Sequence, residues 1–465
     1  MRKIYLLLIS LLTLVSANAQ VTLNGANIYL STGSIFYVTD TVTLNNQASV
    51  DNNGSFQTYG LNVIDGTFHN NVNATSIIVD SVRIGDTLIN DGDFEGTRFM
   101  IPGTGVVVNN ETLRLNKGMR LYNGSSQFHT STGEIVFQGA FDNKRLDFGG
   151  LSQLDVRKIV FDSDNPNHNI ILESSVHVSD TAEFSNGVVR YDDPSDDSLV
   201  IDLTGAVVMD SINGNSFIDD ALYKYPGSVG EFMRFPVGQT GVGYRPLWIL
   251  GANFSGGPSP LIAVEYQGTR TLTSTQTVGY NPTYTANSWS FLSGPEFDSS
   301  IVQLQFASGE ASLAESIIAE GFEVVAGDTI FFNLGQGGTT TIGTNGVVQS
   351  FIPAQGGNST LMVGQSNELK LRLRFLLEGA LPNTSSAVMD VDMTDTLESR
   401  YEFGGLSSKP MLINKSVPVT AVDSVKLFLR TGVSGSIVDS TSVWVMSDGT
   451  IRDYITGEYT YAIFT

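Results

Sequence analysis

The chain has 465 residues, with 25 Lys and Arg against 47 Asp and Glu and a formal net charge of -22. This acidity excludes sequence-independent binding to nucleic acid and electrostatic docking on anionic lipid, because both depend on clustered Lys and Arg. Hydrophobic residues make up 41% and charged residues only 15%. A disordered chain would be more highly charged and less apolar, so we expect a folded protein of several domains.

Residues 1–20 have the three-part layout of a secretory signal peptide. Arg2 and Lys3 precede an apolar run from Ile4 to Val15, and small residues follow up to Ala19. About 12 apolar residues are too few to span a ~30 Å hydrocarbon core, so this segment predicts a cleaved signal (residues 1–19) rather than a membrane anchor. We expect a secreted protein, extracellular or on the outer cell surface, with no transmembrane segment.

The chain contains no Cys. Exported proteins are free to form disulfides, so this one must be held together by apolar burial and backbone hydrogen bonds alone. The composition also excludes a Cys-linked lipid anchor, a thiolate metal site and a Cys nucleophile.

Residues 20–204 predict a β-helix. Short β-branched runs alternate with Asn, Asp and Gly clusters, as at 51–54 and 90–93, and each cluster is typical of a corner between strands. A parallel β-helix has coils of roughly 20 residues, whereas a sandwich has turns every 8–12 residues. The unequal spacing of these clusters favours the β-helix over the sandwich, which remains the second interpretation.

Residues 205–365 predict a β-sandwich module. Strands are expected at 261–266, 288–292, 301–306, 329–333 and 360–363, and 312–320 is the best candidate for a short helix. Residues 366–465 predict a second sandwich module, because apolar and basic residues alternate from Leu369 to Phe375 and Asp448-Gly449 is a strong hairpin signal.

Several motifs resemble those of exported, adhesin-like surface proteins of the Bacteroidota. They are Phe184-Ser185-Asn186-Gly187-Val188-Val189, the pair Phe235-Pro236-Val237-Gly238 and Tyr244-Arg245-Pro246-Leu247, and, in the C-terminal module, Phe375 to Ala380, Asp423 to Arg430 and Met446 to Ile451. The resemblance implies a solenoid followed by β-modules and export by the type IX route. Ser424 stands where the family's module has Trp, and no basic sorting tail ends the chain.

No catalytic motif is present. His69, His129, His168 and His177 lie far apart, and there is no nucleophile elbow, P-loop or dinucleotide fingerprint. A β-helix lyase or glycosidase would assemble its carboxylates and cations from successive coils, and Arg157-Lys158 is the nearest candidate cation pair. An outward-facing structural pair is the commoner role for such residues.

Two acidic segments offer several hard oxygen ligands within one turn, as Ca²⁺ prefers. They contain Asp162, Asp164, Asn165 and Asn167 in the first segment and Asp192, Asp193, Asp196 and Asp197 in the second. Neither has EF-hand spacing, and a solvated turn is the commoner role. Calcium is the one cofactor that the sequence suggests.

Asp followed by Ser or Thr and a hydrophobic residue or Thr is more frequent than random placement predicts. Such triplets begin at Asp40, Asp80, Asp86, Asp180, Asp197, Asp210, Asp328, Asp395, Asp423 and Asp439. They resemble acceptors for periplasmic O-glycosylation in the Bacteroidota. An Asp turn before a β-branched strand gives the same triplet, and the two interpretations have equal weight.

These observations predict a non-enzymatic protein of the cell surface or extracellular space that serves adhesion or surface structure. Its partners would be surface glycans or other surface proteins. The alternative is a polysaccharide-active β-helix enzyme, a lyase or glycosidase, or a glycan-binding module.

Overall fold

The protein is all-β in a computed structural model, with 71% strand and no helix in the part of the chain that is described. The structure describes residues 20–122, 127–149, 153–202, 204–209, 214–255, 259–271, 285–307, 310, 316–325, 328–355, 357–365, 369–371, 421–430, 437–446, 451–453 and 462–464. Two compact units are present. The first ends at Gln365, and the second comprises residues 279–281 and 366–465.

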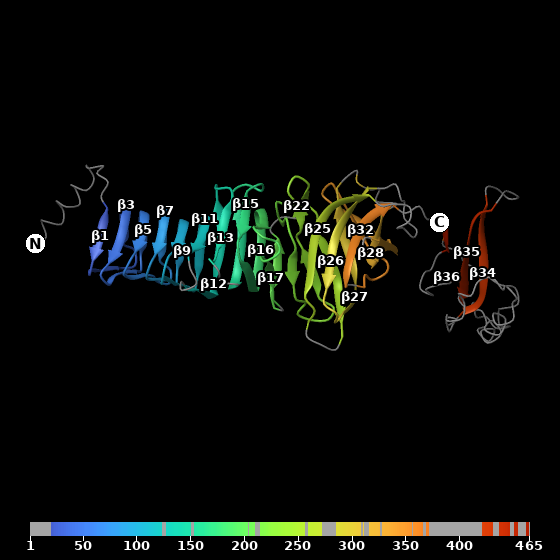
Figure 1. The fold of residues 1–465 in the computed structure, drawn as a ribbon, viewed down its shortest axis with the longest axis horizontal. Helices are drawn as coiled ribbons and strands as arrows, with labels where there is room; N and C mark the ends of the chain where they lie inside the picture. The colour runs from blue at the N-terminus through green and yellow to red at the C-terminus, as the bar shows by residue number, and fades with distance from the viewer. Residues whose placement is uncertain are drawn as a thin grey trace, which may run out of the picture. The chain divides into compact units, whose positions relative to one another are not determined.

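The first unit begins with a β-solenoid of about nine turns, which confirms the predicted parallel β-helix-like architecture. Parallel strands follow one another along the coil axis (Figure 1). Its strands are β1 Val21–Asn24, β2 Asn27–Leu30, β3 Ile35–Asn45, β4 Ala48–Asn52, β5 Ser55–Val63, β6 Gly66–Asn70, β7 Thr75–Ile84, β8 Thr87–Asn90, β9 Asp93–Ile101, β10 Val106–Asn109, β11 Thr112–Leu121, β12 Gln127–Gly139, β13 Lys144–Asp147, β14 Gln153–Ser163, β15 Asn169–Leu172, β16 Ser175–Tyr191, β17 Leu199–Ile201, β18 Ala206–Met209, β19 Ser216–Ile218 and β20 Leu222–Lys224.

The strands of successive coils pair in register and form three stacks. The first stack contains β2, β4, β6, β8, β10 and the start of β12. The second contains the first halves of β3, β5, β7, β9 and β11, and the third contains β1, the second halves of the same strands, and then β13 and β15. Each coil of this part therefore turns through three strand segments of about 20 residues in total.

Alternation within the strands builds the core. In β4 and β6 every second residue is buried, which places Val50 and Phe68 inside and their neighbours toward solvent. Phe56 and Phe68 are fully buried and meet edge to face, with ring centroids 4.9 Å apart. The apolar period of two thus closes a dry interior without any disulfide.

A column of buried asparagines runs up the first stack. Asn52, Asn70, Asn90 and Asn109 have no exposed surface. Each donates from Nδ2 to Oδ1 of the Asn one coil further on, at 2.7 to 2.9 Å, and Asn109 ends the column on Thr130 Oγ1 at 3.3 Å. Each Nδ2 also donates to a backbone carbonyl of a following coil. Buried amides are stable here because both donors are satisfied.

The column residues Asn52 and Asn90 belong to the predicted Asn and Gly clusters at 51–54 and 90–93. The clusters do lie at corners, but their column residues do not adopt the left-handed conformation; the described non-glycine residues that do are Asn46, Gln47, Asn73 and Asn143. The column asparagines are selected for buried side-chain hydrogen bonds rather than for backbone freedom.

Glycine is required where one coil touches the next. A Cβ at Gly66 would lie 2.1 Å from the carbonyl oxygen of Ala48, and one at Gly105 would lie 2.0 Å from that of Ile84. No side chain fits at such a distance, so these positions set the close spacing of the coils.

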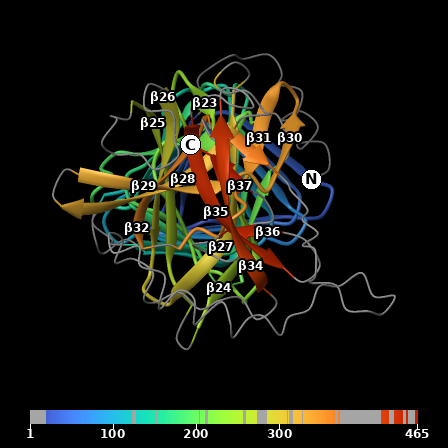
Figure 2. The same ribbon diagram turned by 90° about the vertical axis from the view of Figure 1, so that its right-hand side faces the viewer.

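The solenoid passes directly into an antiparallel sheet. β20 pairs in parallel with β17 but antiparallel with β25 Ile262–Thr271. The sheet continues through β26 Thr285–Ser293, β32 Asn358–Gln365, β28 Ser316–Val325 and β29 Asp328–Gly335. These strands are seen in front of the coils in the view along the solenoid (Figure 2). The short helix expected at 312–320 is wrong for residues 316–320, which belong to β28 and pair with two neighbouring strands. Residues 312–315 lie outside the described residues.

A second antiparallel sheet lies in the same unit. It consists of β21 Phe232–Phe235, β24 Leu247–Phe254, β27 Phe297–Phe306, β31 Asn345–Gln349 and β30 Gly338–Ile342. β22 Gly238–Gln239 and β23 Gly243–Tyr244 form a short hairpin. Buried residues of both antiparallel sheets, such as Leu304 and Trp289, belong to the same apolar core as the solenoid. The β-sandwich module at residues 205–365 stays a prediction.

The Tyr244-Arg245-Pro246-Leu247 motif has a structural role. Arg245 is buried, and its guanidinium donates to Oε1 of Glu310 at 2.9 Å and to the backbone oxygen of Tyr244 at 3.0 Å. Asn287 donates to the other oxygen of Glu310 at 2.7 Å, and Trp289 Nε1 donates to the backbone oxygen of Arg245 at 2.8 Å. The motif thus ties the hairpin to β26.

In the second unit, β34 Ala421–Arg430, β35 Ile437–Met446 and β36 Ile451–Asp453 form an antiparallel sheet. β33 Leu369–Leu371 pairs with β37 Ala462–Phe464. β35 and β36 pair on either side of the predicted Asp448-Gly449 hairpin turn. The motif from Phe375 to Ala380 lies outside the described residues.

Candidate functional site

The two acidic segments predicted to bind calcium lie on the turns after β14 and β16, except Asp162, which is one of the last two residues of β14. Their acceptors serve the turns themselves: Asn165 Oδ1 accepts from the amide of Asn167 at 2.9 Å, and Asp193 Oδ1 accepts from the amide and hydroxyl of Ser195. Burial, together with the nearby acidic side chains, raises the pKa of Asp197. No group of three His, Cys, Asp or Glu side chains is placed to hold a metal among the residues described. Calcium binding stays a prediction.

The other acidic residues of these two segments lie on the surface. Asp162, Asp164, Asp192 and Asp196 are exposed. Asp192 Oδ1 lies 3.6 Å from the guanidinium of Arg145, which belongs to β13, two coils away. The structure places the two segments on successive coils, but each forms its own turn.

The histidines do not converge. His69 contacts Asp91 at 2.7 Å and Asp51 at 3.7 Å, on the coils that flank its own. Burial opposes a low pKa at Asp91, but hydrogen bonds from Asn110 and His69 outweigh it and lower the pKa of this carboxyl. This polar row lies directly outside the asparagine column and joins coil to coil.

Arg157 and Lys158, the candidate cations of a lyase, are engaged in ion pairs. Arg157 lies 3.2 Å from Asp180, and Lys158 lies 3.3 Å from Glu134 and 3.1 Å from Glu183. Burial lowers the pKa of Lys158, but the two glutamates outweigh this and raise it. Both side chains therefore connect neighbouring coils.

Several Asp-Ser/Thr triplets lie at solenoid corners. Asp40 Oδ1 accepts from the amide of Thr41 at 2.7 Å, and Asp86 and Asp180 accept from the hydroxyls of the threonines that follow them. These hydrogen bonds are the ones expected if each Asp serves a turn before a strand. The triplets at Asp210 and Asp395 fall outside the residues described, and O-glycosylation stays a prediction.

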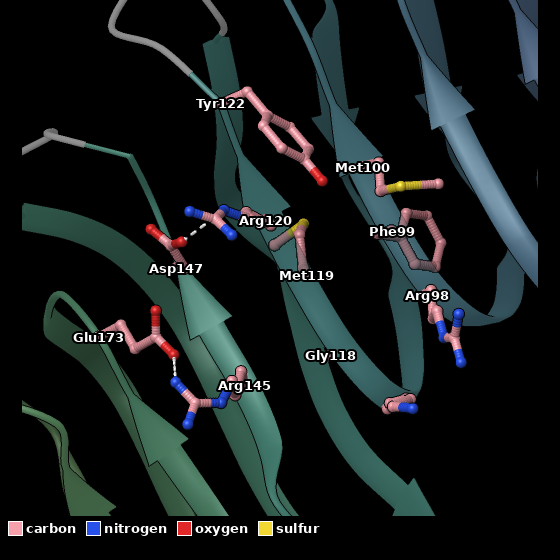
Figure 3. Close-up of a pocket in the computed structure, with 11 residues that line it drawn as sticks. Arg98, Phe99, Met100, Gly118, Met119, Arg120, Tyr122, Arg145, Asp147 and Glu173 are labelled. Carbon is pink, nitrogen blue, oxygen red and sulfur yellow. Dashed lines mark hydrogen bonds and ion pairs between the residues drawn. The ribbon is translucent and has the colours of Figure 1, made fainter.

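A basic groove crosses the outer surface of the third stack (Figure 3). It is a concavity of about 540 Å³ lined by four basic side chains, Arg98, Lys117, Arg120 and Arg145, and by two acidic ones, Asp147 and Glu173. An adjoining hollow of about 450 Å³ adds Arg83 and shares Tyr122 and Met100. We call these residues together the basic groove. Its charge is opposite to that of the chain as a whole.

The groove arises from a β-bulge. The register between β9 and β11 shifts between Leu115 and Gly118, so that β11 has an extra residue at this corner. Gly118 has φ +129°, and a Cβ there would lie 2.0 Å from the backbone oxygen of Arg145. Because Gly118 pairs with Arg98 on one side and Arg145 on the other, the middle of this row carries no side chain. The groove floor is therefore open between two arginines.

One rim of the groove is fixed by ion pairs. Arg120 Nε lies 2.8 Å from Asp147, and Arg145 pairs with Glu173. Arg120 also lies over the ring of Tyr122, 5.1 Å from its centroid. Both arginines keep more than half of their side chains exposed, so their remaining N–H groups face solvent. The pairs hold the guanidinium groups in place without covering them.

The other side of the groove carries cations without carboxylate partners. Arg83 and Arg98 are exposed, and among the described residues neither has a carboxylate oxygen within 4.0 Å. Tyr122 is 52% exposed, so its ring is accessible to a ligand. The groove thus combines unpaired guanidinium groups, fixed guanidinium groups and an accessible aromatic ring.

Comparisons of the chain with known protein families, with characterised proteins and with solved structures found no match. In the described part of the chain, no helix is long and apolar enough to cross a membrane.

Sequence reasoning missed the basic groove. Arg83, Arg98, Arg120 and Arg145 each stand next to a buried residue in a strand, but they are 15 to 25 positions apart and alternate with Asp and Glu elsewhere. A signal exists in the pattern of one outward Arg per coil. It becomes visible only when the coils are aligned in register.

Proposed function

We propose that the chain is an exported, non-enzymatic protein of the cell surface or extracellular space that serves adhesion or surface structure. The observation that carries the proposal is that outward charges of the solenoid are tied from coil to coil. Arg114 with Asp93 at 2.9 Å, Arg157 with Asp180 and Lys158 with two glutamates are such pairs. These groups stiffen an extended scaffold rather than converge on a reacting atom.

The composition and N-terminus support this proposal. Residues 1–19 have the layout of a signal peptide, and the motif resemblance to Bacteroidota surface proteins favours type IX export. The antiparallel sheets of residues 205–365 and 366–465 fit two β-sandwich modules that follow the solenoid. In such a protein the solenoid would present binding surfaces and the following modules would connect it to the cell.

A polysaccharide-active enzyme is the second candidate, and the basic groove favours it. Asp147 and Glu173 are carboxylates beside several cations, which is the residue content of a lyase or glycosidase site. Each carboxylate, however, is held by an arginine of the neighbouring strand. A general base needs a free lone pair within reach of the substrate, so this arrangement supports binding more than proton abstraction.

Three measurements test the proposal. Surface proteolysis and adherence assays on the producing bacterium, with and without the gene, should show an accessible protein whose loss reduces attachment. Incubation of the purified mature chain with marine and plant polysaccharides should release neither reducing ends nor unsaturated products. Product release would establish the enzyme instead, and unchanged attachment would contradict the role in adhesion.

A further inference from the structure

We propose that the basic groove binds a uronate-containing polysaccharide, laid along the coil axis. The inference rests on the proposed function, since it names the partner of an exported adhesive protein. The basic groove is a cationic concavity in a chain with 25 basic and 47 acidic residues, and the adhesive role alone does not account for it.

The cations form a staggered row along the axis. Arg83 and Arg120 lie in one register row on either side of Met100, and Arg98 and Arg145 lie in the next on either side of Gly118. Arg83 belongs to β7, Arg98 to β9, Arg120 to β11 and Arg145 to β13, which are strands of four successive coils. Neighbouring strands are about 4.8 Å apart, so the row spans ~14 Å. A linear polymer lying across these strands would meet one guanidinium group per coil, alternately on one side and on the other.

Carboxylates fit these cations. The guanidinium group has a planar fork of N–H donors that binds a carboxylate through two parallel hydrogen bonds. Arg83 and Arg98 have no carboxylate partner in the described part of the chain, and Arg120 and Arg145 are held by their ion pairs. The fixed pair needs little reorganisation on binding, which lowers the entropic cost.

The aromatic ring and the two acidic side chains narrow the ligand class. Tyr122 offers the flat apolar surface on which the face of a sugar ring packs, and Met100 lies beside it in both hollows. The negative charges of Asp147 and Glu173 repel a ligand that carries several negative charges per sugar. A polysaccharide with one carboxylate per sugar therefore fits this mixture of basic and acidic side chains better than one with several sulfates per sugar.

Other polyanions fit less well. The row is only four coils long, and the chain as a whole has a net charge of -22. A nucleic acid duplex or a lipid surface is broader than this row, and the net charge of the chain opposes the approach of its phosphates. A single polysaccharide chain contacts the row alone.

Binding of oligogalacturonate to the purified mature chain, measured by calorimetry in 50 mM and 500 mM NaCl, tests this inference. We expect binding that weakens at the higher salt, because screening shortens the range of the attraction. Dextran, which carries no charge, should not bind. Equal binding of dextran, or failure of oligogalacturonate to bind in 50 mM NaCl, would overturn the proposal. A highly sulfated dextran or a DNA duplex that binds more tightly than oligogalacturonate would also overturn it.

Variants locate the site. Arg98→Gln should weaken oligogalacturonate binding about 10-fold, the effect of one lost charge-assisted pair, and the double change Arg83→Gln with Arg98→Gln should abolish it. Arg157→Gln is the matched control, since it removes the same charge from an exposed position outside the groove; it should change the dissociation constant less than 2-fold. Thermal melts confirm that each variant folds. Equal losses in Arg98→Gln and Arg157→Gln would place binding elsewhere.

The binding assay and the adherence assay test the two proposals separately. Oligogalacturonate binding without any adherence defect leaves the groove assignment intact and contradicts the role in adhesion. An adherence defect in the gene deletion that Arg98→Gln does not reproduce, with no binding in vitro, contradicts the groove assignment alone.

Discussion

Asn90 donates a hydrogen bond from Nδ2 to Oδ1 of Asn109 at 2.7 Å, and both side chains are completely buried between neighbouring coils. The same Nδ2 donates to the backbone oxygen of Thr112 at 2.9 Å. A buried amide is costly unless its donors and acceptors are satisfied. The asparagine column meets that condition and so stabilises one particular register of the coils.

Asn90→Ala should destabilise the first unit by about 3 kcal/mol, because it leaves buried partners on two coils without hydrogen bonds. Urea denaturation measures the change. Asn110→Ala is the matched control: Asn110 is exposed and its Nδ2 bonds Asp91 at 2.7 Å, so its loss should cost less than about 1 kcal/mol. Similar costs for the two variants would show that the column does not determine stability.

Gly105→Ala should destabilise the solenoid by more than about 2 kcal/mol, since the new Cβ would overlap the backbone oxygen of Ile84. Gly338→Ala in β30 has open space around the same atom and a strand conformation that alanine accepts. We expect its effect on the unfolding free energy to lie within about 0.5 kcal/mol. Thermal and urea unfolding of both variants provide the measurement, and a tolerated Gly105→Ala would contradict the coil spacing.

Lys144 should make stability depend on pH above 8. Its side chain is buried and bonds Ser163 Oγ at 2.6 Å, and burial lowers its pKa from 10.5 to about 8. Between these values the unfolded chain holds a proton that the folded chain has released, so folding becomes more favourable as the pH rises. The stability of the native protein relative to Lys144→Met should therefore increase from pH 8 to 10. A constant difference would rule out a lowered pKa.

Arg245 and Glu310 should show strong coupling. Removing Arg245 leaves a carboxylate without its buried partner, and we expect Arg245→Met to cost about 3 kcal/mol. In a double-mutant cycle with Glu310→Gln, the interaction energy should be about 1 to 2 kcal/mol. Arg157→Met in the exposed pair with Asp180 is the comparison and should cost less than about 1 kcal/mol. Additive effects at Arg245 and Glu310 would mean that the motif stabilises by packing alone.

Local patterns predicted much of the fold. Alternation of apolar residues and the spacing of Asn and Gly clusters identified an all-β chain with a parallel β-helix-like solenoid, because side chains that alternate across a strand record which face is buried. The prediction was wrong at Ser316 to Glu320. Ile317 and Ile318 are adjacent apolar residues that suggest one face of a helix, but both are buried residues of the strand β28. Short apolar runs leave strand and helix ambiguous until a pairing partner is known.

The sequence by itself determined the acidity, the absence of Cys, the leader-like N-terminus and the strand content. Only the tertiary structure decided which Asn side chains are buried and which arginines share a groove. Asn90 and Asn109 are 19 residues apart, and Arg98 and Arg145 are 47 apart. Their contacts depend on the register between coils, which is fixed by long-range backbone pairing and by bulges such as the one before Gly118.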